Sequence, residues 1–243
     1  MNGYATSINT PTKDAHFREI LRTHLRIVKA ITKRYAWADP RYHYWDLNAG
    51  PGIDDQRRVG SPLEFIAQTE EMEVDYRAYF FEKDEKVAAR LEGFVGDKAQ
   101  VFTGDHHLTL PPLFHPKPNC YGLIYCDPSG NVPSFDLLGK FSERYKLVDI
   151  LIYISSANIK RGLMSPMNVC VKRLSEYMSL IQKKHWIVRQ PRDKHQWTFL
   201  LATNWTNFPV FESIGFHRTD SEIGQEIMHR LNTTTKERKN GSF

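Results

Sequence analysis

The chain has 243 residues, of which 41% are hydrophobic and 25% are charged, and its net charge is +5. This composition fits one globular domain of generous size, and no apolar run is long enough to cross a membrane. The first residues lack the apolar core of a secretory signal, and the three cysteines lack metal-type spacing, so we expect free thiols, no metal site and a cytoplasmic protein.

Strands and helices alternate along most of the predicted pattern, which implies a largely parallel sheet with helices on both faces. The expected elements, in chain order, are a helix over 13–35, a strand over 42–47, a helix over 61–72, a strand over 76–82, a helix over 84–95, strands over 99–105 and 121–127, a helix over 134–145, a strand over 147–156, a helix over 166–181, and a late antiparallel pair over 185–190 and 197–205.

Four of the predicted strands end on an acidic residue, namely Asp46, Glu82, Asp105 and Asp127. In open α/β sheets, ligands bind at the carboxyl edge of the strands. We therefore expect these four carboxylates to converge on one rim. This convergence is a stronger functional signal than any single motif.

The stretch DLNAGPGIDD places glycines 50 and 52 directly after the first strand, where a bare backbone can approach a ligand closely. A dinucleotide is disfavoured, because the third glycine of the G-x-G-x-x-G pattern is missing and Pro51 removes a backbone N–H. S-adenosylmethionine has no phosphate and is cationic, so neighbouring acids are an asset. A tight turn without any ligand is the competing interpretation.

In this interpretation Asp46 holds the amino end of the methionine moiety, Glu82 accepts the ribose hydroxyls, and Asp105 accepts the adenine amino group. The expected cofactor-binding residues are Asp46, Asn48, Ala49, Gly50, Gly52, Glu82, Lys83, Gly104, Asp105 and His106. No metal ligand is expected among the ten histidines, since their spacing is not that of a metal site.

The motifs DLNAGPGIDD, GSPLEF, FFEKDEK and DPSG together resemble class I methyltransferases, and more narrowly the three-cysteine-motif partner proteins. The resemblance covers about residues 42–135, and Gly60 to Leu63 is its most specific part. It implies S-adenosylmethionine binding and a Rossmann-like α/β fold, with a mostly parallel seven-stranded sheet, an antiparallel last strand and helices on both faces. Asn48 departs from the family, which tends to have an aromatic residue there. We expect a single methyltransferase domain over 1–243, with a helical extension at 1–40 and a second extension at 205–243.

The stretch CDPSG lies where amino-methyltransferases of nucleic acids carry Asp-Pro-Pro-aromatic. Asp127 and the Pro128 carbonyl can accept the two hydrogens of an exocyclic amine, and we expect Asp127, Pro128 and Ser129 to be the catalytic residues. The stacking aromatic of that motif is missing. Phe135 is either its substitute or the first core residue of the next helix.

Basic residues near the same rim are candidates for contacts with a phosphate backbone. The expected substrate-binding residues are Phe135, Asn158, Lys160, Arg161, Arg192 and Lys194. The loop RQPRDKHQW is expected to expose Arg189 and Trp197 beside these cations, which suits a nucleic-acid strand. The competing interpretation is a solvated hairpin with Trp197 in the sheet core.

The sequence thus predicts an S-adenosylmethionine-dependent methyltransferase that acts on DNA or RNA, on an exocyclic amino group such as adenine N6. Target specificity is expected to be low, because the motifs leave no room for a large recognition domain, and a base in a duplex must be flipped out. The alternative is a non-catalytic module of the same fold that binds a partner protein or nucleic acid. A nicotinamide oxidoreductase is a third possibility, and it requires a bound dinucleotide.

Overall fold

The computed structural model describes residues 10–32, 40–114, 119–128, 131–155, 174–191, 197–206 and 209–232. The chain forms two compact units, Met1–Ile124 and Tyr125–Phe243. The expectation of one domain over 1–243, with extensions at 1–40 and 205–243, stays a prediction. None of the helices in the described ranges is both long and apolar enough to span a bilayer.

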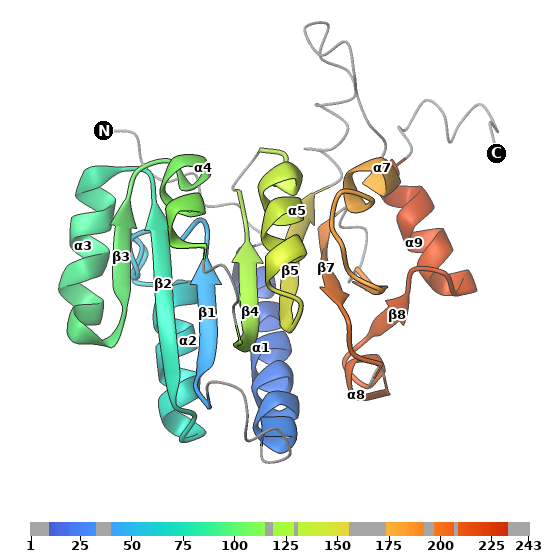
Figure 1. Ribbon diagram of the computed structural model, residues 1–243, viewed down its shortest axis with the longest axis horizontal. Coiled ribbons are helices and arrows are strands. Elements are labelled where there is room, and N and C mark those ends of the chain that lie inside the picture. Colours follow the sequence, from blue (N-terminus) through green and yellow to red (C-terminus); the bar gives the residue numbers. More distant parts are fainter. Residues whose placement is uncertain are drawn as a thin grey trace, which may run out of the picture. The chain divides into compact units, whose positions relative to one another are not determined.

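The first unit contains a parallel sheet (Figure 1). Its elements are α1 (Thr10–Thr32), β1 (Tyr42–Asp46), α2 (Ser61–Glu71), β2 (Tyr76–Glu82), α3 (Glu85–Val95), η1 (Gly96–Lys98), β3 (Gln100–Thr103), α4 (His106–Thr109) and η2 (Pro111–Leu113). Neighbouring strands follow the order β3-β2-β1-β4, in which β1 pairs with β2, and β2 with β3, in parallel. Strand β4 (Tyr121–Cys126) crosses the division between the units.

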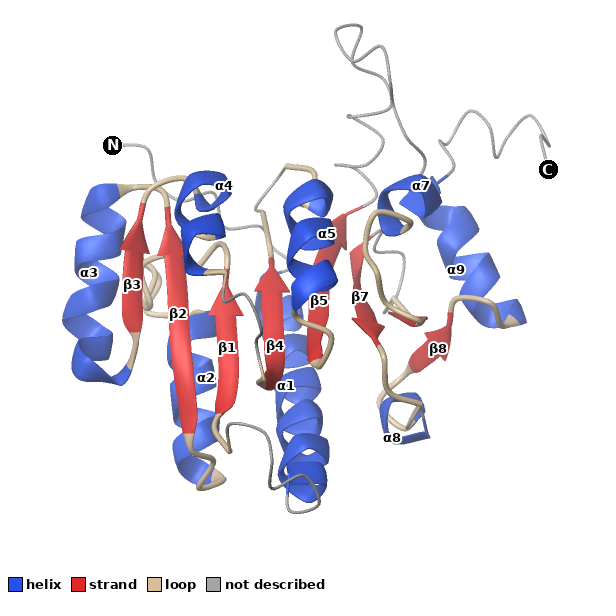
Figure 2. Ribbon diagram, in the orientation of Figure 1, coloured by secondary structure: helices blue, strands red, loops and turns tan. Residues whose placement is uncertain are grey.

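Aromatic residues that alternate along β1 hold two helices against the sheet. Tyr44 stacks on Phe65 of α2 with ring centroids 4.1 Å apart, and the Tyr42 hydroxyl lies 2.7 Å from Nδ1 of His24 in α1. Residues two apart on a strand face the same side, so both contacts lie on one face. Figure 2 shows α1 and α2 on this side of the strands and α4 on the other.

The second unit carries the antiparallel part of the sheet. Its elements are α5 (Phe135–Arg144), β5 (Val148–Ser155), α7 (Leu174–Met178), β6 (His185–Arg189), β7 (Trp197–Thr203), α8 (Pro209–Glu212), β8 (Phe216–Arg218) and α9 (Glu222–Asn232). The strand order is β4-β5-β7-β6-β8, and β7 is antiparallel to both β5 and β6. Every residue of β7 is buried, as expected of a strand inside a sheet that is covered on both faces.

The predicted Rossmann-like α/β class is confirmed, but the described sheet has eight strands where seven were expected. The additional strand, β8, pairs antiparallel with β6 and lies in what was predicted to be an extension. The strand has three residues and only Phe216 is buried. A strand this short does not show the alternation of apolar and polar residues by which strands are predicted. Strand β3 ends at Thr103, two residues earlier than predicted, because Asp105 is the N-cap of α4. The helix predicted over 166–181 lies partly outside the described residues, and its described part contains α7.

A buried lysine closes the end of α5. Lys183 is 9% exposed, and its ammonium donates hydrogen bonds to the carbonyl oxygens of Tyr145 (2.8 Å) and Lys146 (3.0 Å). These carbonyls follow the last turn of the helix, where backbone acceptors have no partner within the helix. Burial lowers the pKa of Lys183 to about 8, against the opposing attraction of Asp149.

This pKa predicts that the stability of the protein depends on pH. Between about 8 and its ordinary value of 10.5, Lys183 is protonated in the unfolded chain but deprotonated in the native one. Because the unfolded state then binds more protons, this group makes the free energy of unfolding rise with pH, by roughly 3 kcal/mol in total. Denaturant titrations across this range should show the rise in wild type and not in Lys183→Met. Replacement of the exposed Lys140 by Met is the control, and an equal pH profile for wild type and Lys183→Met would contradict the prediction.

Candidate functional site

The turn after β1 is organised by the acid that ends the strand. Asp46 is fully buried. Its carboxylate accepts hydrogen bonds from the backbone N–H of Asn48 (3.1 Å) and from the hydroxyl of Tyr44 (3.3 Å). A carboxylate in this position is directed into its own turn. These hydrogen bonds give Asp46 a role in shaping the turn, and its expected contact with the methionine moiety stays a prediction.

Glu82, at the end of β2, joins this turn to the next one. Its Oε2 accepts from the backbone N–H of Gly50 and its Oε1 from that of Asp84, both at 2.9 Å. The side chain is 8% exposed. A carboxylate offers about four acceptor positions in all, and hydroxyl groups are among the donors that it can bind.

The backbone at Gly50 is bare on one side. Gly50 has a φ of 68°, and a Cβ built on it would meet no atom within 4 Å. Open space therefore adjoins the backbone at the point where Glu82 holds it. This matches the expectation that residues 49 to 52 admit a ligand close to the main chain.

Gly52, unlike Gly50, has no open space beside it and packs tightly against α3. Its φ is 78°, and a Cβ built there would lie 3.1 Å from Leu91 Cδ1 and 3.3 Å from Phe94 Cδ2, both on α3. Its carbonyl accepts from the N–H of Gly60 at 2.7 Å, which closes a hairpin over residues 52–60 before α2 begins. Gly50 thus leaves space beside the backbone, whereas Gly52 lets the hairpin pack against α3. This hairpin was not predicted from the sequence.

The segment after β3 supplies the third acid. The Gly104 N–H donates to the Glu82 carbonyl at 2.9 Å, and the Asp105 carboxylate accepts from the His107 N–H, also at 2.9 Å, as the N-cap of α4. This hydrogen bond lowers the pKa of Asp105, as do the nearby His106, His107 and Lys83, against a smaller effect of burial. The carboxylate is therefore ionised at neutral pH and can accept an amino group.

The ligating atoms of Asp105, His106 and His107 all lie within 4.8 Å of one another, so a cation can be accommodated there geometrically. His107 is exposed and the other two are partly buried. The expectation that the chain binds no metal stays a prediction.

The predicted catalytic motif follows β4 in the second unit. Asp127 is 8% exposed, and the Tyr125 hydroxyl donates to its Oδ2 at 3.2 Å. The Pro128 carbonyl accepts from the Asn131 N–H at 2.7 Å. Ser129 lies outside the described residues. Asp46, Glu82 and Asp105 follow neighbouring strands of the first unit, whereas the convergence of Asp127 with them stays a prediction.

The structure decides two alternatives that the sequence left open, and in both it favours the core. Phe135 is 2% exposed and stacks on Tyr177 with ring centroids 5.1 Å apart, so it is the first core residue of the helix, and its place among the expected substrate-binding residues is not supported. Trp197 and Arg189 are 5% and 4% exposed, because both belong to strands of the sheet and not to the loop between them. The remaining substrate candidates, Asn158, Lys160, Arg161, Arg192 and Lys194, lie outside the described residues.

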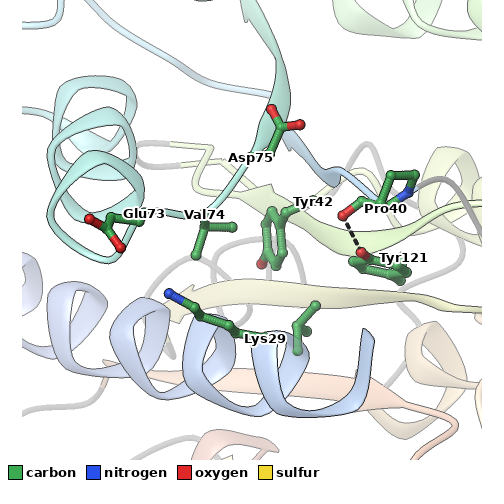
Figure 3. A pocket seen from close by; sticks show the side chains of 8 residues that line it. Lys29, Pro40, Tyr42, Glu73, Val74, Asp75 and Tyr121 are labelled. Carbon is green, nitrogen blue, oxygen red and sulfur yellow. Dashed lines mark hydrogen bonds between the residues drawn. The ribbon is translucent and has the colours of Figure 1, made fainter. Parts of the chain in front are cut away.

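A pocket of about 150 Å³ opens in the first unit, near the amino ends of β1 and β4 (Figure 3). The side chains of Tyr42 and Tyr121 line it, and the Tyr121 hydroxyl donates to the Pro40 carbonyl. Its volume is below the roughly 300 Å³ at which ligand pockets usually begin. It lies at the opposite ends of the strands from Asp46 and Glu82, so it is not the expected cofactor site.

Comparisons with known proteins find no matching protein family and no matching curated protein. Among solved structures, protein LPL1258 from Legionella pneumophila has 13% identity over 82% of this chain and 90% of that chain, with a TM-score of 0.49. The O-methyltransferase TomG from Streptomyces achromogenes, solved with S-adenosylmethionine, has 12% identity over 83% and 82%, with a TM-score of 0.48. An rRNA methylase from Streptococcus thermophilus has 10% identity over 83% and 100%, with a TM-score of 0.44. At these values the similarity carries no argument about function, which must come from the residues themselves.

The hydrogen bonds of Glu82 lead to a prediction about cofactor affinity. Glu82→Ala should weaken S-adenosylmethionine binding by about 1.5–3 kcal/mol, which is the scale of hydrogen bonds to a charged group. Isothermal titration calorimetry measures this, with thermal unfolding as a check on the fold. Glu92→Ala, an exposed acid on α3, is the matched control. An affinity equal to that of the Glu92→Ala control would show that Glu82 does not contact the cofactor.

Proposed function

We propose that the protein is an S-adenosylmethionine-dependent methyltransferase that acts on nucleic acid, at an exocyclic amino group such as adenine N6, with little sequence specificity. The observation that carries the proposal is the bridge made by Glu82. Its carboxylate holds the bare backbone of Gly50 beside open space, so a ligand there would meet an acidic side chain and exposed main chain together. A cationic ligand with two hydroxyl groups suits that combination.

Three acids of the first unit have different roles in binding the cofactor. Glu82 accepts the ribose hydroxyls, and the ionised Asp105 accepts the adenine amino group. Asp46 positions the turn through Asn48 and Tyr44, because its buried carboxylate is already engaged there. When bound, S-adenosylmethionine would supply an activated methyl group on a sulfonium, and breaking of that carbon–sulfur bond would leave neutral S-adenosylhomocysteine.

On the acceptor side, Asp127 and the Pro128 carbonyl accept the two hydrogens of the substrate amine. This arrangement directs the nitrogen lone pair out of conjugation with the base and toward the methyl group. As the nitrogen gains the methyl group, Asp127 takes up the proton that it loses. The Tyr125 hydroxyl fixes the orientation of the Asp127 carboxylate.

One observation favours a second candidate, a non-catalytic module with the same fold. The Pro128 carbonyl already accepts a hydrogen bond from the Asn131 N–H, which uses one of its two lone pairs. If the remaining lone pair is not accessible to the amine, the acceptor site is incomplete. Such a protein would still bind the cofactor or a nucleic acid.

A tritium-transfer assay to bulk DNA, RNA and protein tests the proposed function. The wild type should label nucleic acid, and nucleoside analysis should place the label on an amino group. Asp127→Ala should lower the rate at least about 100-fold, the scale of general acid–base catalysis, while cofactor affinity survives.

Asp136→Ala, an exposed acid in the first turn of α5, is the matched control and should transfer at the wild-type rate. Cofactor binding by wild type without transfer to any polymer would favour the non-catalytic module. Loss of cofactor binding in Asp127→Ala would show that this residue does not belong to the acceptor side.

A further inference from the structure

The tip of the hairpin over residues 52–60 is organised around one carboxylate. Oδ1 of Asp54 accepts from the backbone N–H groups of Gln56 and Arg58, both at 2.9 Å, and its Oδ2 forms an ion pair with the Arg58 guanidinium at 2.7 Å. Burial acts to raise the pKa of Asp54, but these hydrogen bonds outweigh it and leave the pKa below its usual value. Arg57, at the tip, is thereby fixed in a left-handed conformation with a φ of 61°.

A stripe of exposed side chains runs along α3 beside this hairpin. Lys86, Arg90 and Phe94 follow one another at a spacing of four residues, so they share one face of the helix. All three are exposed, and Phe94 retains 45% of its surface. Ala89 and Gly93 are the exposed neighbours on the same face, and neither obstructs an approaching molecule.

Two contacts join the hairpin to this stripe. Asp55 forms an ion pair with Arg90 at 3.1 Å, and the packing of Gly52 places the Phe94 ring against the base of the hairpin. We call the resulting set of residues, Arg57, Lys86, Arg90 and Phe94, the hairpin–α3 surface. It belongs entirely to the first unit and begins at the same turn that carries Gly50.

The charges of this surface contribute little to the stability of the fold. Among the described residues, the side chains of Arg57 and Lys86 form no hydrogen bond or ion pair. Lys86 also lies in the first turn of α3, where a cation opposes the helix dipole. The Arg90–Asp55 pair is exposed, and exposed pairs add little stability, so Arg90 can exchange its partner at small cost.

We propose that the hairpin–α3 surface binds a single-stranded segment of nucleic acid that flanks the reacting base. The proposal rests on the proposed function, because it places the flank of the same substrate. Arg57 and Lys86 contact phosphates, and Phe94 stacks against a base. Cations interleaved with an exposed aromatic are the pattern of proteins that bind single strands without sequence preference.

The composition of the surface favours nucleic acid over a protein partner. A protein interface buries an apolar centre inside a polar rim, whereas here the one large ring lies beyond two cations, Lys86 and Arg90, on the same face of α3. Cations spaced along a helix face can contact phosphates, and the affinity of such contacts depends strongly on salt. Low sequence specificity agrees with this arrangement, since neither phosphates nor base faces encode a particular sequence.

Fluorescence anisotropy with labelled single-stranded RNA and DNA of mixed sequence tests the surface at several salt concentrations, on the full chain. Arg57→Ala and Lys86→Ala should each weaken binding about three- to tenfold and reduce the slope of log affinity against log salt by ~0.7. Phe94→Leu preserves apolar packing against Gly52, and it should weaken binding about fivefold or more without changing the slope. The RNA and DNA arms distinguish which polymer the surface prefers.

Lys98→Ala is the matched control, because it removes one exposed cation next to the same helix, outside the surface. If Arg57→Ala and Lys86→Ala equal Lys98→Ala in affinity and slope, or if the wild type binds neither oligonucleotide, the surface proposal is overturned. The tritium assay judges the proposed function separately. Salt-dependent binding through these residues without methyl transfer would support the proposed binding surface and contradict the proposed methyltransferase activity.

Discussion

The geometry of the candidate site depends on one carboxylate that links two loops. Glu82 accepts the backbone N–H groups of Gly50 and Asp84, so the turn after β1 and the loop after β2 are held by the same group. Hydrogen bonds to an ionised acceptor are stronger than those between neutral groups. Because β1 and β2 are paired in parallel, the two loops leave the sheet at the same edge. Everything proposed for the cofactor follows from the position that this bridge imposes on residues 49 to 52.

Much of this arrangement can be read from the sequence, because strand patterns show where polar residues end a buried run. Glu82 was expected at the end of its strand and is found there, and Asp46 ends β1 as expected. The pattern does not show which groups the carboxylate of such an acid contacts. Asp46 and Glu82 share the same kind of position, yet one is fully buried in its own turn and the other bridges to a neighbouring turn.

The sequence left open whether three residues belong to the core or to an exposed site. Arg189, Trp197 and Phe135 were predicted inside their elements, but each is a terminal residue, and the pattern of such a residue does not show whether its side chain faces the core or the solvent. The hairpin over residues 52–60 was missed because its sequence lacks the Asn-Gly or Asp-Gly pair that marks short hairpins. Arg57 adopts the left-handed conformation that such a pair would normally supply, with Asp54 bonding the surrounding backbone.

The hairpin joins the turn proposed for the cofactor to the surface proposed for nucleic acid. Gly52 is restricted on one side by Leu91 and Phe94, and its carbonyl is fixed by Gly60. Any movement of the hairpin is therefore transmitted to the turn within two residues of Gly50. A polymer bound along α3 would press on the same backbone that Glu82 holds from the other side. Close-packed contacts of this kind transmit small displacements instead of absorbing them, so under both proposals a polymer on the surface would act on the shape of the turn.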